Sequence, residues 1–341
     1  MLFRSGPYIH EQYLQGEGST LKKNPDYIDA KNIWFNRYLV KVMTDAATRN
    51  AALKTSQVDW IDSAGLTPAD VKTMEGPTVK VYENISSSTT NISWNMTNPK
   101  FKDYRLRLAM SKAFDRQVYI DQTLQANGKW TGIVPVDFGK MALTQDEVKA
   151  HNVMKYDPAE AKKLFEAAGG KSGMTVEYYY NSNGTTDSVQ MQLISKQWEQ
   201  NLGIKTTLKT EDYSIFLPKM YLGAKGPGGG YAEMFTTTYG IPNWHEHLFA
   251  PYLPGGNRNG STFEDAEVTK ALDDLKQTLD DNAAYEKSRK IQLLLWEKFL
   301  PMTQRPTPRS FGAYNSKLRN FPQPGNYPPG MEWSYGTWKA K

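Results

Sequence analysis

The 341-residue chain carries 41 lysine and arginine residues against 36 aspartate and glutamate residues, and 39% of it is hydrophobic. This length and composition predict a globular protein with a large core and two domains, and they exclude intrinsic disorder. The net charge of +5 is spread without a block of like charges, so no nucleic-acid partner is expected. The chain has no cysteine, which excludes disulfides and thiolate sites, and no run of about 18 apolar residues that could span a membrane.

Short strand and helix signals alternate over the first hundred residues. Apolar runs predict strands at 39–43, 58–61, 79–82 and 90–96, and an alanine-rich segment predicts a helix over 45–54. Thr67 followed by Pro68 and Asp70 supplies a helix cap, a proline at the first helical position and an acid at the third, which opens a helix that ends near Gly76. The alternation is typical of an α/β fold.

Residues 94–116 combine an apolar strand end, an Asn98-Pro99 turn and a helix capped by Asp103. The apolar residues of the helix recur at helical spacing on one face: Leu106, Met110, Ala113, Phe114 and Val118. Its basic residues are therefore expected to lie mostly on the other faces: Arg105, Arg107, Lys112 and Arg116.

The second half continues with the same alternation. Asp157, Pro158 and Glu160 open a helix that Gly169 ends, a strand is expected over 174–180, and a helix ending at Gly203 leads to a strand over 204–208. This β-α-β order suits a parallel or mixed sheet. Two amphipathic helices are expected over 268–279 and 291–299, and the proline-rich chain after Pro301 is expected to be extended.

Several of these segments, in this order, resemble motifs of the family 5 extracellular solute-binding proteins, which are the peptide- and nickel-type receptors of ABC importers. The matching segments are residues 24–27, 45–53, 57–59, 94–116 and the helix opening at 157. The resemblance implies an α/β, type II periplasmic-binding-protein fold, with two α/β lobes joined by a hinge.

In this arrangement residues 6–100 and 303–341 form the first lobe and residues 101–302 the second, with the Asn98-Pro99 turn near the hinge. Gly6-Pro7-Tyr8 resembles a turn that lies well inside the first lobe of the family. The resemblance therefore implies an N-terminally truncated chain with an incomplete first lobe, exposed apolar strand edges and a signal peptide lost with the missing segment. The expected location is periplasmic or extracellular, at the membrane.

His245-Glu246-His247 is the most metal-like cluster in the sequence. Imidazoles two positions apart share a face only on a strand, whereas Pro242 and Pro251 predict a loop or one short turn. The sequence therefore favours structural or ligand-lining histidines, and no metal or cofactor is expected. The glycine run at 226–230 lacks the Lys-Ser/Thr ending of a phosphate loop and is interpreted as a connector.

The resemblance places the ligand segment at residues 231–259. The family aspartate that pairs with the α-amino group of a peptide has no counterpart here, since Gly240 or Pro242 occupies its position. A buried ammonium without a carboxylate would cost several kcal/mol, which argues against ordinary peptides. Aromatic and amide groups that suit uncharged polar ligands remain as candidate ligand-binding residues: Tyr239, Asn243, Trp244, His245, Asn257 and Asn259.

The sequence thus supports three functional hypotheses. The first is a monomeric, non-enzymatic receptor that captures an oligopeptide or similar small oligomer between its lobes and delivers it to ABC permease subunits. The second is the same receptor fold binding an oligosaccharide. The third is a glycoside hydrolase, for which neighbouring acids such as Glu211 and Asp212 would have to act as a pair, although adjacent strand residues point to opposite faces.

Overall fold

The computed structural model describes residues 5–84, 87–181, 185–223, 229–241, 243–319, 321 and 338–339. Contacts within the chain divide it into two units, Met1–Ile85 with Arg309–Lys341 (unit 1) and Ser86–Pro308 (unit 2). The sequence analysis placed the divisions after residues 100 and 302. The first division comes earlier because strand β6 (Ser88–Trp94) pairs along its whole length with strands of the unit 2 sheet.

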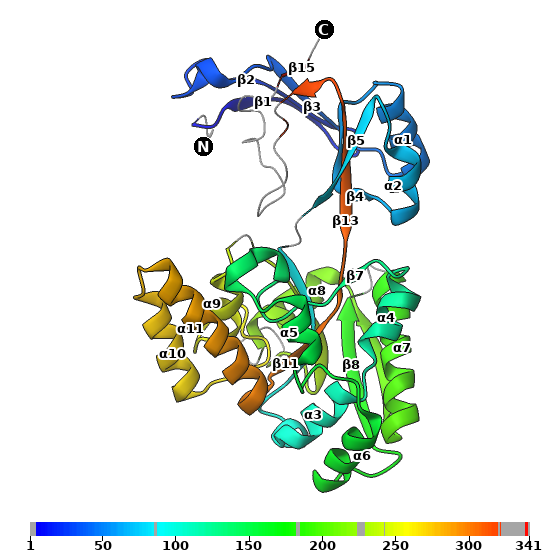
Figure 1. The fold of residues 1–341 in the computed structure, drawn as a ribbon, viewed down its shortest axis with the longest axis vertical. Helices are drawn as coiled ribbons and strands as arrows, with labels where there is room; N and C mark the ends of the chain where they lie inside the picture. The colour runs from blue at the N-terminus through cyan, green and yellow to red at the C-terminus, as the bar shows by residue number, and fades with distance from the viewer. Residues whose placement is uncertain are drawn as a thin grey trace. The chain divides into compact units, whose positions relative to one another are not determined.

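The described part of unit 1 contains two three-stranded sheets and a two-stranded ladder (Figure 1). The antiparallel first sheet consists of β1 (Tyr8–Leu14), β2 (Gly18–Lys23) and β3 (Arg37–Lys41). The second has the order β4 (Trp60–Leu66), β13 (Ser310–Asn315) and β5 (Val79–Asn84), with β13 antiparallel to both neighbours. The late strand β13 is therefore the centre of a sheet whose other strands come from the first hundred residues. A short ladder joins β14 (Leu318–Arg319) to β15 (Trp338–Lys339).

Two helices pack against the second sheet, α1 (Ala46–Lys54) and α2 (Pro68–Met74). Both begin at the residues that the sequence predicted: the Asp45 carboxylate accepts from Thr48 N, and Thr67 forms a reciprocal capping box with Asp70. The core beneath them is formed by Leu53, Ile61, Leu66, Met74, Val79 and Ala313.

We expect Thr67→Ala to lower the free energy of unfolding of unit 1 by about 1 kcal/mol, because Thr67 Oγ1 accepts from Asp70 N and this amide has no other helical partner. Urea unfolding of the variant measures the loss. Thr73→Ala, in the exposed last turn of the same helix, is the matched control. Equal losses for the two variants would contradict a role of the capping box.

The first sheet of unit 1 exposes large apolar side chains on its outer strands. Tyr13 on β1 is 64% exposed and Leu39 on β3 is 58% exposed, and Leu14 and Val40 are also exposed. These side chains lie on the two outer strands of the sheet, with β2 between them.

Unit 2 is built on a five-stranded mixed sheet (Figure 1). Its order is β11 (Met302–Arg305), β6, β10 (Met234–Gly240), β8 (Thr175–Asn181) and β9 (Lys205–Glu211). β8 and β9 are parallel and are connected by α7 (Thr185–Leu202), as the β-α-β pattern predicted. β6 is antiparallel to both β10 and β11. A separate short ladder joins β7 (Gly128–Lys129) to β12 (Thr307–Pro308).

Helices surround this sheet and share one large core, in which Trp94, Trp198 and Trp296 are fully buried. No helix in the described ranges is long and apolar enough to cross a membrane. The remaining helices of unit 2 are α3 (Tyr104–Lys112), α4 (Arg116–Thr123), α5 (Gln145–Ala150), α6 (Pro158–Ala167), α8 (Tyr213–Leu222), α9 (Glu246–Tyr252), α10 (Ala266–Lys276) and α11 (Asp281–Leu294), which continues as a π-helical turn over Leu295–Phe299.

The segment after the Asn98-Pro99 turn differs from its prediction in two ways. It forms two helices instead of one, because α3 ends at Lys112 and the Asp115 carboxylate accepts from two amides to begin α4. The expected outward position was wrong for three of the four basic residues, since Arg107, Lys112 and Arg116 are at most 2% exposed. Their charged groups are buried because backbone carbonyls surround them; Arg107 Nε, for example, donates to Leu300 O at 3.1 Å.

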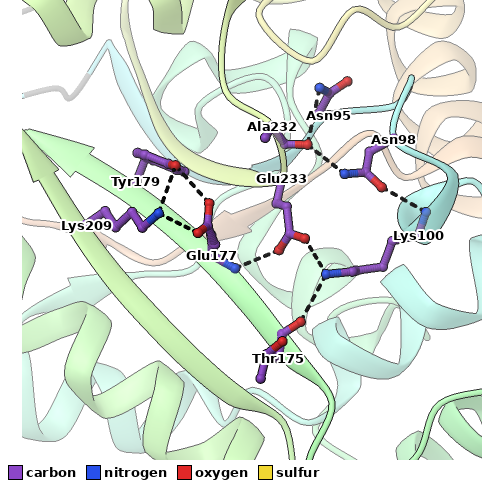
Figure 2. Close-up of polar contacts among 9 residues, drawn as sticks. All are labelled: Asn95, Asn98, Lys100, Thr175, Glu177, Tyr179, Lys209, Ala232 and Glu233. Atoms are coloured by element: carbon purple, nitrogen blue, oxygen red, sulfur yellow. Dashed lines mark hydrogen bonds and ion pairs between the residues drawn. The ribbon is translucent and has the colours of Figure 1, made fainter.

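The Asn98-Pro99 turn lies at the end of β6 that is remote from the entry of the chain into unit 2, so its expected position near a hinge was wrong. A polar network there joins it to the beginnings of β8 and β10 (Figure 2). Asn98 Nδ2 donates to Ala232 O at 2.8 Å, and Lys100 donates to Thr175 O at 3.0 Å and pairs with Glu233. The turn thus anchors the start of β10, whose other end carries the candidate ligand segment.

Candidate functional site

The candidate ligand segment begins at the carboxyl end of β10. There Gly240 lies opposite Ser88 at the start of β6, and Ile241 N donates to Ser87 O at 3.2 Å. The loop after β10 therefore sits next to the point where the chain enters unit 2. Position 242, which the sequence analysis proposed as one replacement for the family aspartate, lies outside the described residues.

His245, Glu246 and His247 lie at the start of α9 and not in a loop, with Pro251 in the last turn of the helix. His247 is 1% exposed, its Nε2 donates to Ile241 O at 3.2 Å, and its ring lies 5.6 Å from that of Phe138. His245 is partly exposed. Within the described ranges, no three His, Cys, Asp or Glu residues are grouped to hold a metal ion. The two histidines thus have different surroundings, and His247 is a core residue.

Burial lowers the pKa of His247 to about 4, below its ordinary value of 6.5. The unfolded chain therefore binds a proton that the folded chain excludes, and the stability of unit 2 should fall as the pH drops from 6.5 towards 4. The full shift corresponds to about 3 kcal/mol. We expect His247→Gln to remove much of this dependence in thermal unfolding followed from pH 7 to 4. His10→Gln, at an exposed histidine, is the control and should keep the pH dependence of the wild type. If His247→Gln also keeps it, His247 is not its source.

Tyr239 and Asn259, two of the six candidate ligand residues, are buried and bonded to the backbone. Tyr239 is 2% exposed and its hydroxyl donates to Arg258 O at 2.9 Å. Asn259 Nδ2 donates to Phe263 O at 2.6 Å, and its Oδ1 accepts from Phe263 N at 2.9 Å. Both side chains therefore shape the loop over residues 257–263.

The other four candidates keep accessible surface. Asn243 and Asn257 are exposed, whereas Trp244 and His245 are partly buried, with their rings edge to face at 5.6 Å. Their aromatic and amide groups are available to a ligand at the end of β10. The structure thus separates the predicted set into two loop-shaping residues and four surface-accessible ones.

Arg258, which lies between the candidate residues Asn257 and Asn259, is not among the residues predicted from the sequence. Its guanidinium carbon is 4.8 Å from the centre of the Tyr221 ring, and that ring stacks on Tyr239 at 6.3 Å and 19°. The sequence could have indicated Arg258, because it is the only lysine, arginine, aspartate or glutamate between His247 and Phe263. Tyr221 carried no such signal, since only the packing of α8 on β10 brings it there.

Glu211 and Asp212 are both engaged in local structure. The Glu211 carboxylate pairs with Lys219 at 2.6 Å and accepts from the Tyr231 hydroxyl at 2.8 Å. Asp212 caps α8 by accepting from Ser214 N at 2.8 Å, and hydrogen bonds from the Ser214 hydroxyl and backbone N–H lower the pKa of Asp212. The two acids thus join β9 to α8 and to Tyr231, which lies before β10.

A hollow of about 470 Å³ lies elsewhere in unit 2, between α5 and α11. Its lining includes Lys140, Asp146, Lys149, Tyr285 and Arg289, and none of the six candidate residues. It is therefore separate from the segment after β10.

Comparison with solved structures establishes the fold class. The substrate-binding protein CtaP of an ABC transporter from Listeria monocytogenes matches with a TM-score of 0.76 at 20% identity, covering 99% of this chain and 67% of that one. The oligopeptide-binding protein AppA from Bacillus subtilis, solved with a nonapeptide, matches with a TM-score of 0.73 at 18% identity, covering 99% and 67%. The chain therefore has the α/β, type II periplasmic-binding-protein fold, as predicted.

Residues 2–260 match the sequence model of the bacterial extracellular solute-binding proteins, family 5, and the chain belongs to this family. Di/tripeptide-binding protein 3 of Pseudomonas aeruginosa is 24% identical over 330 residues, which cover 93% of this chain and 58% of that protein. The probable deoxycholate-binding protein YgiS of Escherichia coli is 27% identical over 218 residues, or 62% of this chain and 39% of that protein. The chain thus spans just over half the length of the peptide-binding relatives that it matches.

Proposed function

We propose that the chain acts as the solute-binding receptor of an ABC importer, which captures an oligopeptide or similar small oligomer and delivers it to the membrane permease. The observation that carries the proposal is membership of family 5 over residues 2–260. The relatives named as di/tripeptide-binding proteins and the related structure of Helicobacter pylori DppA with the peptide STSA support the ligand class. The receptor would work as a monomer in the periplasm or outside the cell, at the membrane.

We propose further that Asn243, Trp244, His245 and Asn257 contact the ligand. Their exposure at the end of β10 supports this role. Tyr239 and Asn259 would contribute indirectly, by holding the backbone of the loop over residues 257–263.

Binding of an oligosaccharide is the second candidate function. It is favoured by the aromatic and amide character of these residues and by the missing partner for a peptide α-amino group. The relative named for deoxycholate supports a family scaffold that accommodates solutes other than peptides. Glycoside hydrolysis is less well supported, because Glu211 and Asp212 serve local structure and the matched proteins are binding proteins.

A thermal-shift screen with trialanine, tetra-alanine, maltotriose and maltotetraose tests the proposal. A ligand at 100 times its Kd should stabilise the folded state by about 2.7 kcal/mol. Trp244→Ala should reduce the shift, whereas Trp34→Ala, at a tryptophan of unit 1 that is 62% exposed, should not. Stabilisation by the peptides alone would eliminate the sugar alternative, and stabilisation by the sugars alone would eliminate the peptide receptor.

A further inference from the structure

Arg258 is held in a defined position at the edge of the candidate site. Its backbone N donates to Ala250 O at 3.2 Å and its backbone O accepts from the Tyr239 hydroxyl at 2.9 Å. Its guanidinium lies over the ring of Tyr221, and this ring stacks on the ring of Tyr239. The charge is therefore held by a cation–π contact. The side chain is partly buried, so its movement is restricted while part of its surface remains accessible to solvent.

The charge of Arg258 has no counter-charge among the described residues. Its Nη1 is buried and makes no hydrogen bond there, and no aspartate or glutamate of the described ranges pairs with it. Its charge acts on Tyr221, Tyr239 and His247, and all three are neutral near pH 7. The buried Arg107 and Arg116 differ, because carbonyl oxygens occupy their donors.

We infer that Arg258 forms an anion-binding subsite that receives a carboxylate of the ligand. A guanidinium presents a planar fork of donors that matches a carboxylate, and an unpaired, partly buried charge gains most from such a partner. The position of the family aspartate thus carries no carboxylate for a ligand ammonium, whereas Arg258 offers a cation for a ligand anion. The inference rests on the proposed receptor function and specifies its ligand class: peptides bound through the C-terminal carboxylate, or acidic sugars.

Isothermal titration calorimetry of the full chain with four probes tests the subsite: tetra-alanine, tetra-alanine with a C-terminal amide, maltotriose, and a trigalacturonate as the acidic sugar. Arg258→Gln removes the charge, Arg258→Lys keeps it without the fork, and Arg105→Gln is the control at an exposed arginine already paired with Asp103. We expect a carboxylate probe to bind wild type and Arg105→Gln equally, and to bind Arg258→Gln about tenfold or more weakly. The affinity of Arg258→Lys for the same probe should lie between those of wild type and Arg258→Gln.

Comparing tetra-alanine with its C-terminal amide distinguishes loss of the contact with Arg258 from loss of folded structure in the variant. If tetra-alanine is the ligand, its amide should bind wild type as weakly as the free acid binds Arg258→Gln, and Arg258→Gln should no longer distinguish acid from amide. Equal binding of acid and amide by wild type, or binding of maltotriose unaffected by Arg258→Gln, would overturn the subsite and leave the receptor function standing. Binding of none of the four probes to wild type would contradict the receptor function and the subsite with it.

Discussion

Arg116→Ala is expected to lower the free energy of unfolding of unit 2 by about 3 to 5 kcal/mol. Arg116 is fully buried at the start of α4, and burial lowers its pKa to about 9, which still leaves it charged near neutral pH. Its guanidinium donates to Gln304 O and Met154 O at 3.1 Å each and to Thr303 Oγ1 at 2.7 Å. Removing it leaves several buried oxygens without this donor and opens a cavity in the interior of unit 2.

Urea unfolding followed by tryptophan fluorescence measures this loss, since Trp94, Trp198 and Trp296 are all buried in the unit 2 core. Arg116→Lys should also be strongly destabilising, because one ammonium cannot reach acceptors spread around a planar guanidinium. Arg105→Ala is the matched control, with an exposed ion pair expected to contribute at most about 1 kcal/mol. Similar losses for Arg116→Ala and Arg105→Ala would contradict the structural role of Arg116.

Gly260→Ala is expected to destabilise unit 2 by about 2 to 3 kcal/mol and to abolish the thermal shift caused by ligand. A Cβ at this position would lie 1.8 Å from Met220 O and 3.2 Å from the Phe235 ring. The first of these atoms belongs to the backbone of α8, so no side-chain rotation relieves the clash. The loop over residues 257–263 would have to move, and Asn257 and Arg258 would move with it.

Gly240→Ala is the control for this substitution. Gly240 ends β10 in the same region, but a Cβ there meets only Ser88 Oγ, at 3.9 Å, and its backbone requires no positive φ. The control should therefore retain stability in thermal unfolding. If Gly260→Ala unfolds like Gly240→Ala and keeps the ligand-induced shift, the close approach of the loop to α8 has no role in ordering the site.

Much of the secondary structure could be predicted because its signals are local. Thr67 and Asp157 cap the helices that begin after them, and Gly203 adopts a positive φ of 70° where α7 ends. These features depend on hydrogen bonds between residues about three positions apart and on the freedom of glycine. The candidate site was harder to predict: sequence reasoning selected the segment after β10 but could not distinguish the buried Tyr239 from the accessible Trp244.

The family, the α/β class and the order of most helices and strands could be predicted, because ordered motifs and periodicity are properties of short segments. The burial of the charged side chains depends on the tertiary fold. Arg107 and Arg116 look like solvent-facing residues of an amphipathic segment, yet their acceptors include residues 193 and 188 positions away. Arg258 stands in an uncharged loop, and only the packing of α8 on β10 places an aromatic ring beneath it. Burial of a charge depends on distant partners, and no local pattern reports them.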